Sequence, residues 1–133
     1  MKKELINAPG LAQPRGYTHA VSVEGARRLI FVSGQVGIDQ QGAIVGQGDL
    51  KAQATQALRN LVTALAAAGA TPDDIVKMNI YIVNYSQADY RAYRDARAEV
   101  LPQGDPPAST LIGVTSLAAE GLMIEIEAVA AIA

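Results

Sequence analysis

The sequence predicts an α+β domain in which two helices pack on one face of a single mixed sheet of about six strands. Two segments carry apolar residues at helical spacing, one between Asp49 and Gly69 and one that ends at Pro102. Apolar stretches of strand length precede the first segment, separate the two and follow the second. Strands that neighbour one another at both ends of the chain favour an α+β fold over a repeated strand-helix unit.

The N-terminal third is predicted to form a β-hairpin. A loosely alternating stretch at Tyr17–Val23 is interrupted at Glu24–Ala26 and followed by the apolar run Leu29–Val32. Residues Gly34–Gly48 contain five glycines and one candidate for a short strand, Ala43–Val45. This glycine-rich segment is therefore expected to be mainly loop.

The first helix is expected to begin at Asp49, because apolar residues recur from there at three- and four-residue steps. It should end near Gly69, a residue suited to a left-handed C-terminal cap. A short turn at Thr71–Asp74 then leads into a strand at Ile75–Val83, in which apolar and polar residues alternate.

The second helix is expected to start at Ser86 or Gln87 and to end before Pro102, which cannot continue a helix. Two further strands follow a loop that is rich in glycine and proline. They are predicted at Ala108–Val114 and Leu122–Ile132.

The last predicted strand is unusually apolar. Its only charged residues are Glu125 and Glu127, so little of it suits a sheet face exposed to water. An uncovered apolar face on a soluble protein usually marks an interface, and the sequence therefore predicts a homo-oligomer.

Length and composition indicate one domain spanning residues 1–133. Half of the 133 residues are hydrophobic, yet no apolar run approaches the roughly 20 residues that a membrane helix needs. The segment Met1–Leu5 lacks the apolar core of a signal peptide, so we expect a cytoplasmic protein that does not bind membranes.

Charge and residue counts exclude several classes of function. Eleven Lys and Arg against 13 Asp and Glu give a net charge of −2, which argues against nucleic acid as a partner. The chain has no cysteine and one histidine, so a thiolate nucleophile, a cysteine zinc site and a multi-histidine metal site are not available within it. No metal site is predicted.

Glu125 and Glu127 are the strongest catalytic candidates read from the residues alone. At a two-residue spacing they project from one face of a strand, and a partly desolvated carboxylate there could activate water. The alternative, which is commoner for acidic residues, is two solvent-facing charges on an edge strand. His19 is expected to be a hydrogen-bonded or surface residue, because a single imidazole has no partners for a metal site. Ser33 is expected to have a capping or hydrogen-bonding role, because no nucleophile motif surrounds it.

Several segments in order along the chain together resemble the RidA family, also called the YjgF or reactive-intermediate deaminase family. The matching segments are Arg15-Gly16-Tyr17, Phe31–Gln35, Ala52–Gly69, Asp74–Lys77, Pro107–Ser109 and Ile124–Ala130. The resemblance covers nearly the whole chain. It implies a chorismate-mutase-like fold assembled as a homotrimer with small-molecule clefts between subunits, which agrees with the uncovered sheet face.

The resemblance also implies a chemistry and a set of site residues. Characterised members hydrolyse enamines and imines without a metal or organic cofactor. A carboxylate that matches Glu125 positions or activates water in those members. A tyrosine and a serine that match Tyr17 and Ser33 line the pocket, and backbone groups near Gly34 help to hold the ligand.

One position departs from the family pattern. Deaminase members carry an arginine that clamps the substrate carboxylate, and Ser109 stands at that position here. A hydroxyl replaces neither the charge nor the fork of a guanidinium. Arg15 is the nearest alternative cation in sequence, and Arg94 is a more remote one.

Three functions remain open from the sequence. The first is a hydrolase of enamines or imines with altered substrate specificity. The second is a non-catalytic trimeric protein that binds or senses a small molecule. The third is the ribonuclease activity in some family names, which one histidine and a negative net charge disfavour.

Overall fold

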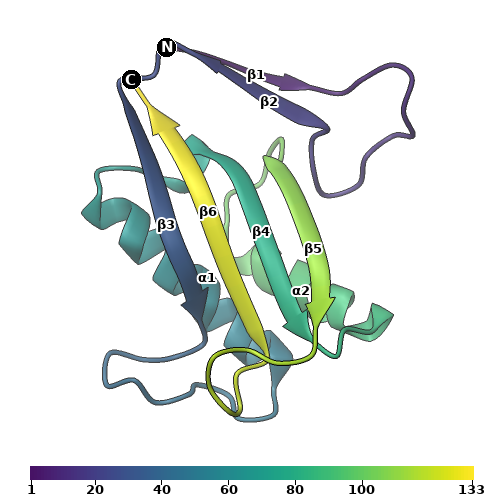
Figure 1. Cartoon of the computed structure of the whole chain (residues 1–133), viewed down its shortest axis with the longest axis vertical. Coiled ribbons are helices and arrows are strands. Elements are labelled where there is room, and N and C mark those ends of the chain that lie inside the picture. Colours follow the sequence, from purple (N-terminus) through teal and green to yellow (C-terminus); the bar gives the residue numbers. More distant parts are fainter.

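The computed structural model describes all 133 residues and contains six strands and two α-helices (Figure 1). The strands are β1 (Lys2–Ile6), β2 (Ala20–Glu24), β3 (Arg28–Val36), β4 (Ile75–Val83), β5 (Ala108–Val114) and β6 (Ile124–Ile132). The helices are α1 (Leu50–Ala67) and α2 (Gln87–Val100), with a 3-10 turn, η1, at Pro72–Asp74. Neither helix is long and apolar enough to cross a membrane.

Four strands form the main sheet, in the order β3-β6-β4-β5. Strand β6 runs antiparallel to both of its neighbours, whereas β4 and β5 are parallel. Both helices lie behind the sheet in Figure 1 and cover the same face. The predicted mixed sheet with two helices on one face is therefore confirmed.

The predicted hairpin over Tyr17–Val32 is wrong. Strand β2 pairs with β1 in a separate two-stranded sheet, and β3 pairs with β6. The six strands thus divide into sheets of two and four instead of one sheet of about six. An alternating pattern shows that a segment is a strand but does not specify the strand it pairs with.

Two shorter predictions also need correction. Strand β1 was not predicted, because its sequence is short, contains three charged residues and leaves all but one residue exposed. The short strand expected at Ala43–Val45 is reduced to a single bridge between Ile38 and Ile44. The last strand begins at Ile124, two residues later than expected.

The core lies between α1 and the main sheet. Helix α1 contributes an apolar stripe, and β4 and β6 contribute every second residue. The largest fully buried apolar side chains of this core are Leu58, Leu61 and Leu65 of α1, Met78, Ile80 and Ile82 of β4, and Ile124 and Ile126 of β6. Helix α2 adds the buried side chains of Tyr93 and Ala96.

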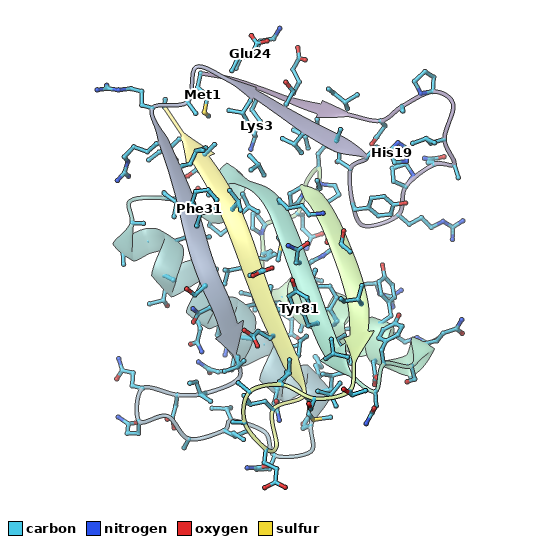
Figure 2. All side chains as sticks on the ribbon, in the orientation of Figure 1. Met1, Lys3, His19, Glu24, Phe31 and Tyr81 are labelled. Carbon is cyan, nitrogen blue, oxygen red and sulfur yellow. The ribbon has the colours of Figure 1, made fainter.

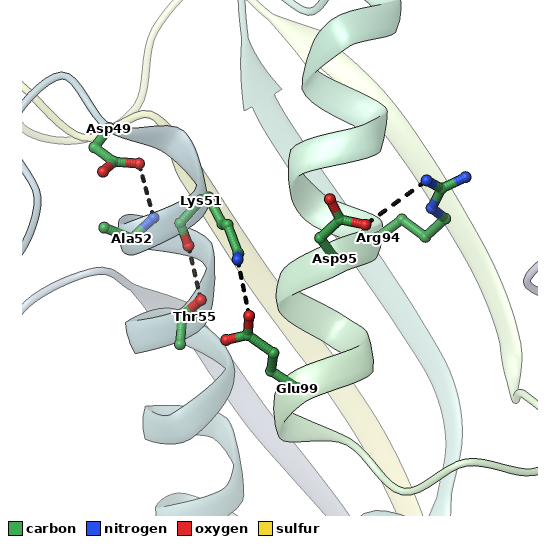
Figure 3. A network of polar contacts seen from close by, with 7 residues as sticks. All are labelled: Asp49, Lys51, Ala52, Thr55, Arg94, Asp95 and Glu99. Atoms are coloured by element: carbon green, nitrogen blue, oxygen red, sulfur yellow. Dashed lines mark hydrogen bonds and ion pairs between the residues drawn. The ribbon is translucent and has the colours of Figure 1, made fainter.

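The predicted C-terminal cap of the first helix is confirmed, and Asp49, where the helix was expected to begin, is its N-cap. The Asp49 carboxylate accepts a hydrogen bond of 3.0 Å from the Ala52 amide (Figure 3). At the other end Gly69 has φ +84°, and the Ala70 amide donates back to the Leu65 carbonyl at 2.9 Å.

An ion pair joins the two helices at their solvent side. Lys51 of α1 lies 2.8 Å from Glu99 of α2 (Figure 3). The Lys51 hydrogen bond and charge lower the pKa of Glu99, and those of Glu99 raise the pKa of Lys51. Both side chains are exposed, so this pair contributes little to stability.

A buried glutamine fixes the loop that leads into β6. Gln53 of α1 is fully buried, and its amide nitrogen donates to the carbonyls of Gly46 and Gly121 at 3.2 and 3.0 Å. Its carbonyl oxygen accepts from the Met123 amide at 2.9 Å. Because Met123 is two residues before Glu125, this side chain helps to position the start of β6.

We expect Gln53→Leu to lower the free energy of unfolding by about 3 kcal/mol, because it leaves buried backbone groups without partners. Urea denaturation measures the effect. The matched control on the same helix is Thr63→Ala, which removes a 3.0 Å bond from an exposed residue to the Arg59 carbonyl. Equal losses in the two variants would contradict the role given to Gln53.

Candidate functional site

The face of the main sheet opposite the helices carries the two glutamates of β6. The alternating residues of β6 that face the helices are buried, whereas Glu125 and Glu127 are half-buried on the other face. Strand β6 lies between β3 and β4. The predicted shared face is confirmed, and the alternative that placed the two charges on an edge strand is wrong.

Glu127 is held by two side chains of β4. Its Oε1 accepts hydrogen bonds from the Tyr81 hydroxyl at 2.6 Å and from the Asn79 amide at 3.1 Å. The bond to Glu127 raises the pKa of Tyr81, and burial and the charges of both glutamates act in the same direction. The Tyr81 hydroxyl therefore stays protonated and keeps the Glu127 carboxylate in place.

Glu125 is in a different environment on the same strand. Its backbone is paired in the sheet, but no side chain or backbone group of the chain donates a hydrogen bond to its carboxylate. Its carboxylate lies directly over Gly34, where a Cβ atom added to the glycine would be 1.8 Å from Oε2. The register between β3 and β6 shifts between Val32 and Gln35, which places Gly34 in a bulge. Glu125 is thus an unpaired carboxylate on a backbone surface that only glycine leaves open.

Ser33 lines a hollow of about 370 Å³ that Glu125 itself does not line. It precedes Gly34 and lines the hollow with Lys77, Asn79 and Glu127. The Lys77 ammonium donates to the Thr110 hydroxyl at 2.9 Å. The sequence analysis did not select Lys77, Asn79 and Tyr81 as site residues. The available signal was their alternation with apolar residues, which places all three on one face of β4.

The exposed rim of this face is apolar. Phe31 on β3 is 74% exposed, and Leu29 on the same strand and Ile112 on β5 are 59% and 46% exposed. Figure 2 shows Phe31 on the outer strand β3 and Tyr81 nearer the other side of the sheet. Large apolar side chains this exposed are typical of a surface that a partner covers.

Arg15 and Tyr17 lie on the loop between β1 and β2, away from Glu125. The loop is fixed beside the start of β5, because Thr18 donates from its amide to the Pro107 carbonyl at 3.2 Å and from its hydroxyl to the Pro106 carbonyl at 2.6 Å. Figure 1 shows this loop at the end of the sheet opposite to the start of β6. Within a single chain, Arg15 and Tyr17 therefore do not lie near Glu125.

His19 stabilises the same loop. Its Nδ1 accepts a hydrogen bond from the Ala8 amide at 3.0 Å, and its Nε2 lies 3.0 Å from the Ala12 carbonyl. Both ring nitrogens therefore have partners, which agrees with the hydrogen-bonding role expected from the sequence. Figure 2 places His19 beyond the main sheet.

Ser109 is also separate from Glu125 within the chain. It pairs with the buried Met78 and alternates with Leu111, which packs on the core, so the register places it on the helix side of β5. Glu125 pairs with Tyr81, two strands across and three residues along. At ~3.3 Å per residue and ~4.8 Å per strand, the two Cα atoms are about 14 Å apart.

The structure therefore brings together Glu125, Gly34 and Ser33 among the predicted site residues. Arg15, Tyr17 and Ser109 lie at the other end of the chain's sheet.

The model of the endoribonuclease L-PSP family matches residues 6–132. The chain belongs to this family. A 2-iminobutanoate/2-iminopropanoate deaminase of Dermatophagoides farinae is 33% identical over 131 residues, which cover 98% of this chain and 97% of the relative. The family assignment confirms the resemblance to RidA and YjgF proteins.

Solved structures of the same family share the fold. YyfB of Yersinia pestis, a conserved Rid family protein of unknown function, matches with a TM-score of 0.91 and 39% identity over 99% of this chain and 100% of that one. RidA of an Antarctic Psychrobacter species matches with a TM-score of 0.69 and 28% identity over 91% and 92%. The predicted RidA-type fold is confirmed.

The contact between Glu125 and Gly34 gives a test of this site by stability. Gly34→Ala forces the glutamate to move, so it should cost about 1–3 kcal/mol in the parent. In the Glu125→Ala background most of that cost should disappear, because the clashing carboxylate is gone. A thermodynamic cycle by urea denaturation measures the coupling, and additive effects would show that the two residues are not in contact.

Proposed function

We propose that the protein hydrolyses reactive enamines and imines to carbonyl compounds and ammonia, with Glu125 as the group that activates water. The observation that supports this most is the unpaired Glu125 carboxylate over Gly34. A carboxylate that accepts no hydrogen bond from the protein is free to accept a proton from water. Glu127 is engaged by Tyr81 and Asn79 and is a poorer candidate for the base.

The proposed reaction needs one base that also returns its proton. Water attacks the carbon of the C=N bond while Glu125 takes a proton from it, and the proton passes to the nitrogen to give a carbinolamine. Glu125 then takes the hydroxyl proton and returns it to the nitrogen as the C–N bond breaks with its electron pair on nitrogen. Ammonia leaves as the carbonyl forms, and the carboxylate is restored. An enamine enters the same sequence after a proton is added to its carbon.

We propose that a homotrimer completes the site. Arg15, Tyr17 and Ser109 lie too far from Glu125 to share one small ligand with it in a single chain. A neighbouring subunit could supply these residues to a cleft that contains Glu125, Ser33 and Gly34. The exposed Phe31, Leu29 and Ile112 on the open face support burial of this face against another copy.

The substrate is proposed to differ from that of the usual deaminase members. Ser109 offers a neutral hydroxyl, so a substrate carboxylate would need another cation. Arg15 is exposed and lies next to Tyr17, which makes it the first candidate for this contact. The cytoplasmic location and the absence of a cofactor stay predictions.

A non-catalytic small-molecule-binding protein is the alternative function, and Ser109 is the observation that favours it. A protein that binds a ligand without turning it over does not need an arginine that orients an imine. Ribonuclease activity has less support, because His19, the single histidine, is bonded at both ring nitrogens.

Replacing the proposed base is the first test. Glu125→Gln should lower the rate of imine hydrolysis by at least about a hundredfold, because the amide cannot accept the proton. Imines are generated from a panel of amino acids by an amino-acid oxidase, and semicarbazide traps what remains. Glu127→Gln is the matched control and should cost much less. Unchanged turnover in Glu125→Gln would remove the proposed mechanism.

Restoring the family arginine is the second test. In the same assay, Ser109→Arg should increase hydrolysis of simple 2-imino acids by about tenfold or more, because a charge-assisted contact of ~1.5–3 kcal/mol is regained. Ser109→Met, of similar length but uncharged, is the control. Activity in Ser109→Arg with none in the parent on any imine would favour the binding protein over the hydrolase.

A further inference from the structure

The structure contains a second cavity, of about 390 Å³, between the β1–β2 hairpin and the rest of the domain. Leu5 and Val21 of the hairpin line one side, and Met78, Arg97 and Leu101 line the other. It shares no lining residue with the hollow beside Ser33. Met78 belongs to the helix side of the sheet, so the two cavities lie on different sides of it.

The hairpin is held over this cavity by bonds from side chains to carbonyl groups. Arg97 donates to the Gly16 carbonyl at 2.8 Å, and the Thr18 hydroxyl donates to that of Pro106 at 2.6 Å. The Lys3 ammonium donates to the Asp73 carbonyl from the hairpin side. The cavity therefore lies between the hairpin and the domain, at the place where these bonds join the two.

Three cationic residues line this cavity, Lys3, Arg94 and Arg97, and Arg97 has the strongest case as an anion site. Its side chain is half-buried, and no carboxylate lies within 4.0 Å of it. Asp73 and Asp105 also line the cavity, but neither forms an ion pair with Arg97. Partial burial weakens the hydration of a cation, so a guanidinium without a counter-ion favours the binding of an anion.

A buried hydroxyl group lies one helical turn before Arg97. The Tyr93 side chain is 3% exposed and its oxygen has no hydrogen-bond partner. Burial raises the pKa of Tyr93 to about 12, although the charge of Arg97 acts in the opposite direction. Arg97 thus has no carboxylate partner in the chain, and Tyr93, which does not line the cavity, lies beside it on the same helix.

We propose that this cavity binds a small monocarboxylate with an apolar body, held by Arg97 with a weaker contribution from Arg94. The planar guanidinium fork matches a carboxylate. The acidic groups of Asp73 and Asp105 disfavour a dianion such as phosphate. The walls at Leu5, Val21, Met78 and Leu101 suit an apolar substituent, and the volume is that of a small-molecule site.

The three methionines of the chain allow a direct test by NMR of protein labelled with ¹³C at the methionine methyl groups. Met78 lines this cavity, whereas Met123 lies before β6 at the Glu125 end. Titration with 3-phenylpropanoate should move the Met78 signal in a saturable way and leave that of Met123 unchanged. The neutral analogue 3-phenylpropanamide should bind at least about tenfold more weakly.

Variants on one helix provide matched controls. Arg97→Gln should weaken binding of 3-phenylpropanoate by about tenfold or more, and Arg94→Gln by less. Arg91→Gln, an exposed change outside the cavity, should have no effect. If Arg97→Gln does not fold, Arg94→Gln and the amide comparison on the parent still decide the question.

The proposal is overturned if the amide binds as well as the acid, if folded Arg97→Gln binds like the parent, or if Met78 does not respond at millimolar ligand. A shift of Met123 in place of Met78 would assign the ligand to the Glu125 site. Because Met78 reports binding and not turnover, failure here leaves the proposed hydrolase unaffected.

Discussion

The register of β6 is the constraint on which the rest of the structure depends. Its buried residues Ile124, Ile126 and Ala128 face the helices, and pairing on both sides fixes them against β3 and β4. A shift by one residue would exchange the two faces and place Glu125 and Glu127 in the apolar core at high cost. The packing under the helices therefore determines where the carboxylates of the open face lie.

Glu125 and Glu127 have the same side chain but differ in hydrogen bonding, because different residues lie next to them on the neighbouring strands. Glu127 pairs with Asn79 and accepts hydrogen bonds from the Asn79 amide and the Tyr81 hydroxyl. Glu125 extends over Gly34. The local sequence around the two residues is nearly the same, so it does not distinguish them. The distinction comes from β3 and β4, which are distant in sequence, and a bulge at a glycine makes the space for the free carboxylate.

The parts of the fold that were predictable from the sequence are those fixed by local patterns. The apolar stripe of the first helix, its start at Asp49 and its end at Gly69 were predicted and are confirmed. The pairing of β2 was predicted wrongly and β1 was missed, because strand partners depend on contacts between segments. The family motifs identified Glu125 and Ser33, but no local pattern predicts their separation from Tyr17 and Ser109, which follows from strand order and register.

The β1–β2 hairpin is attached to the domain in a different way from every other strand. It shares no ladder with the main sheet, and its place depends on side chains such as Lys3, Thr18 and Arg97 that reach backbone carbonyls. A ladder distributes the stability of a strand over many bonds, whereas each of these anchors is a single contact, and elements held in this way are the first to open. Because the loop of Arg15 and Tyr17 belongs to this hairpin, the position of both residues is set by these few anchors and not by the register that positions Glu125.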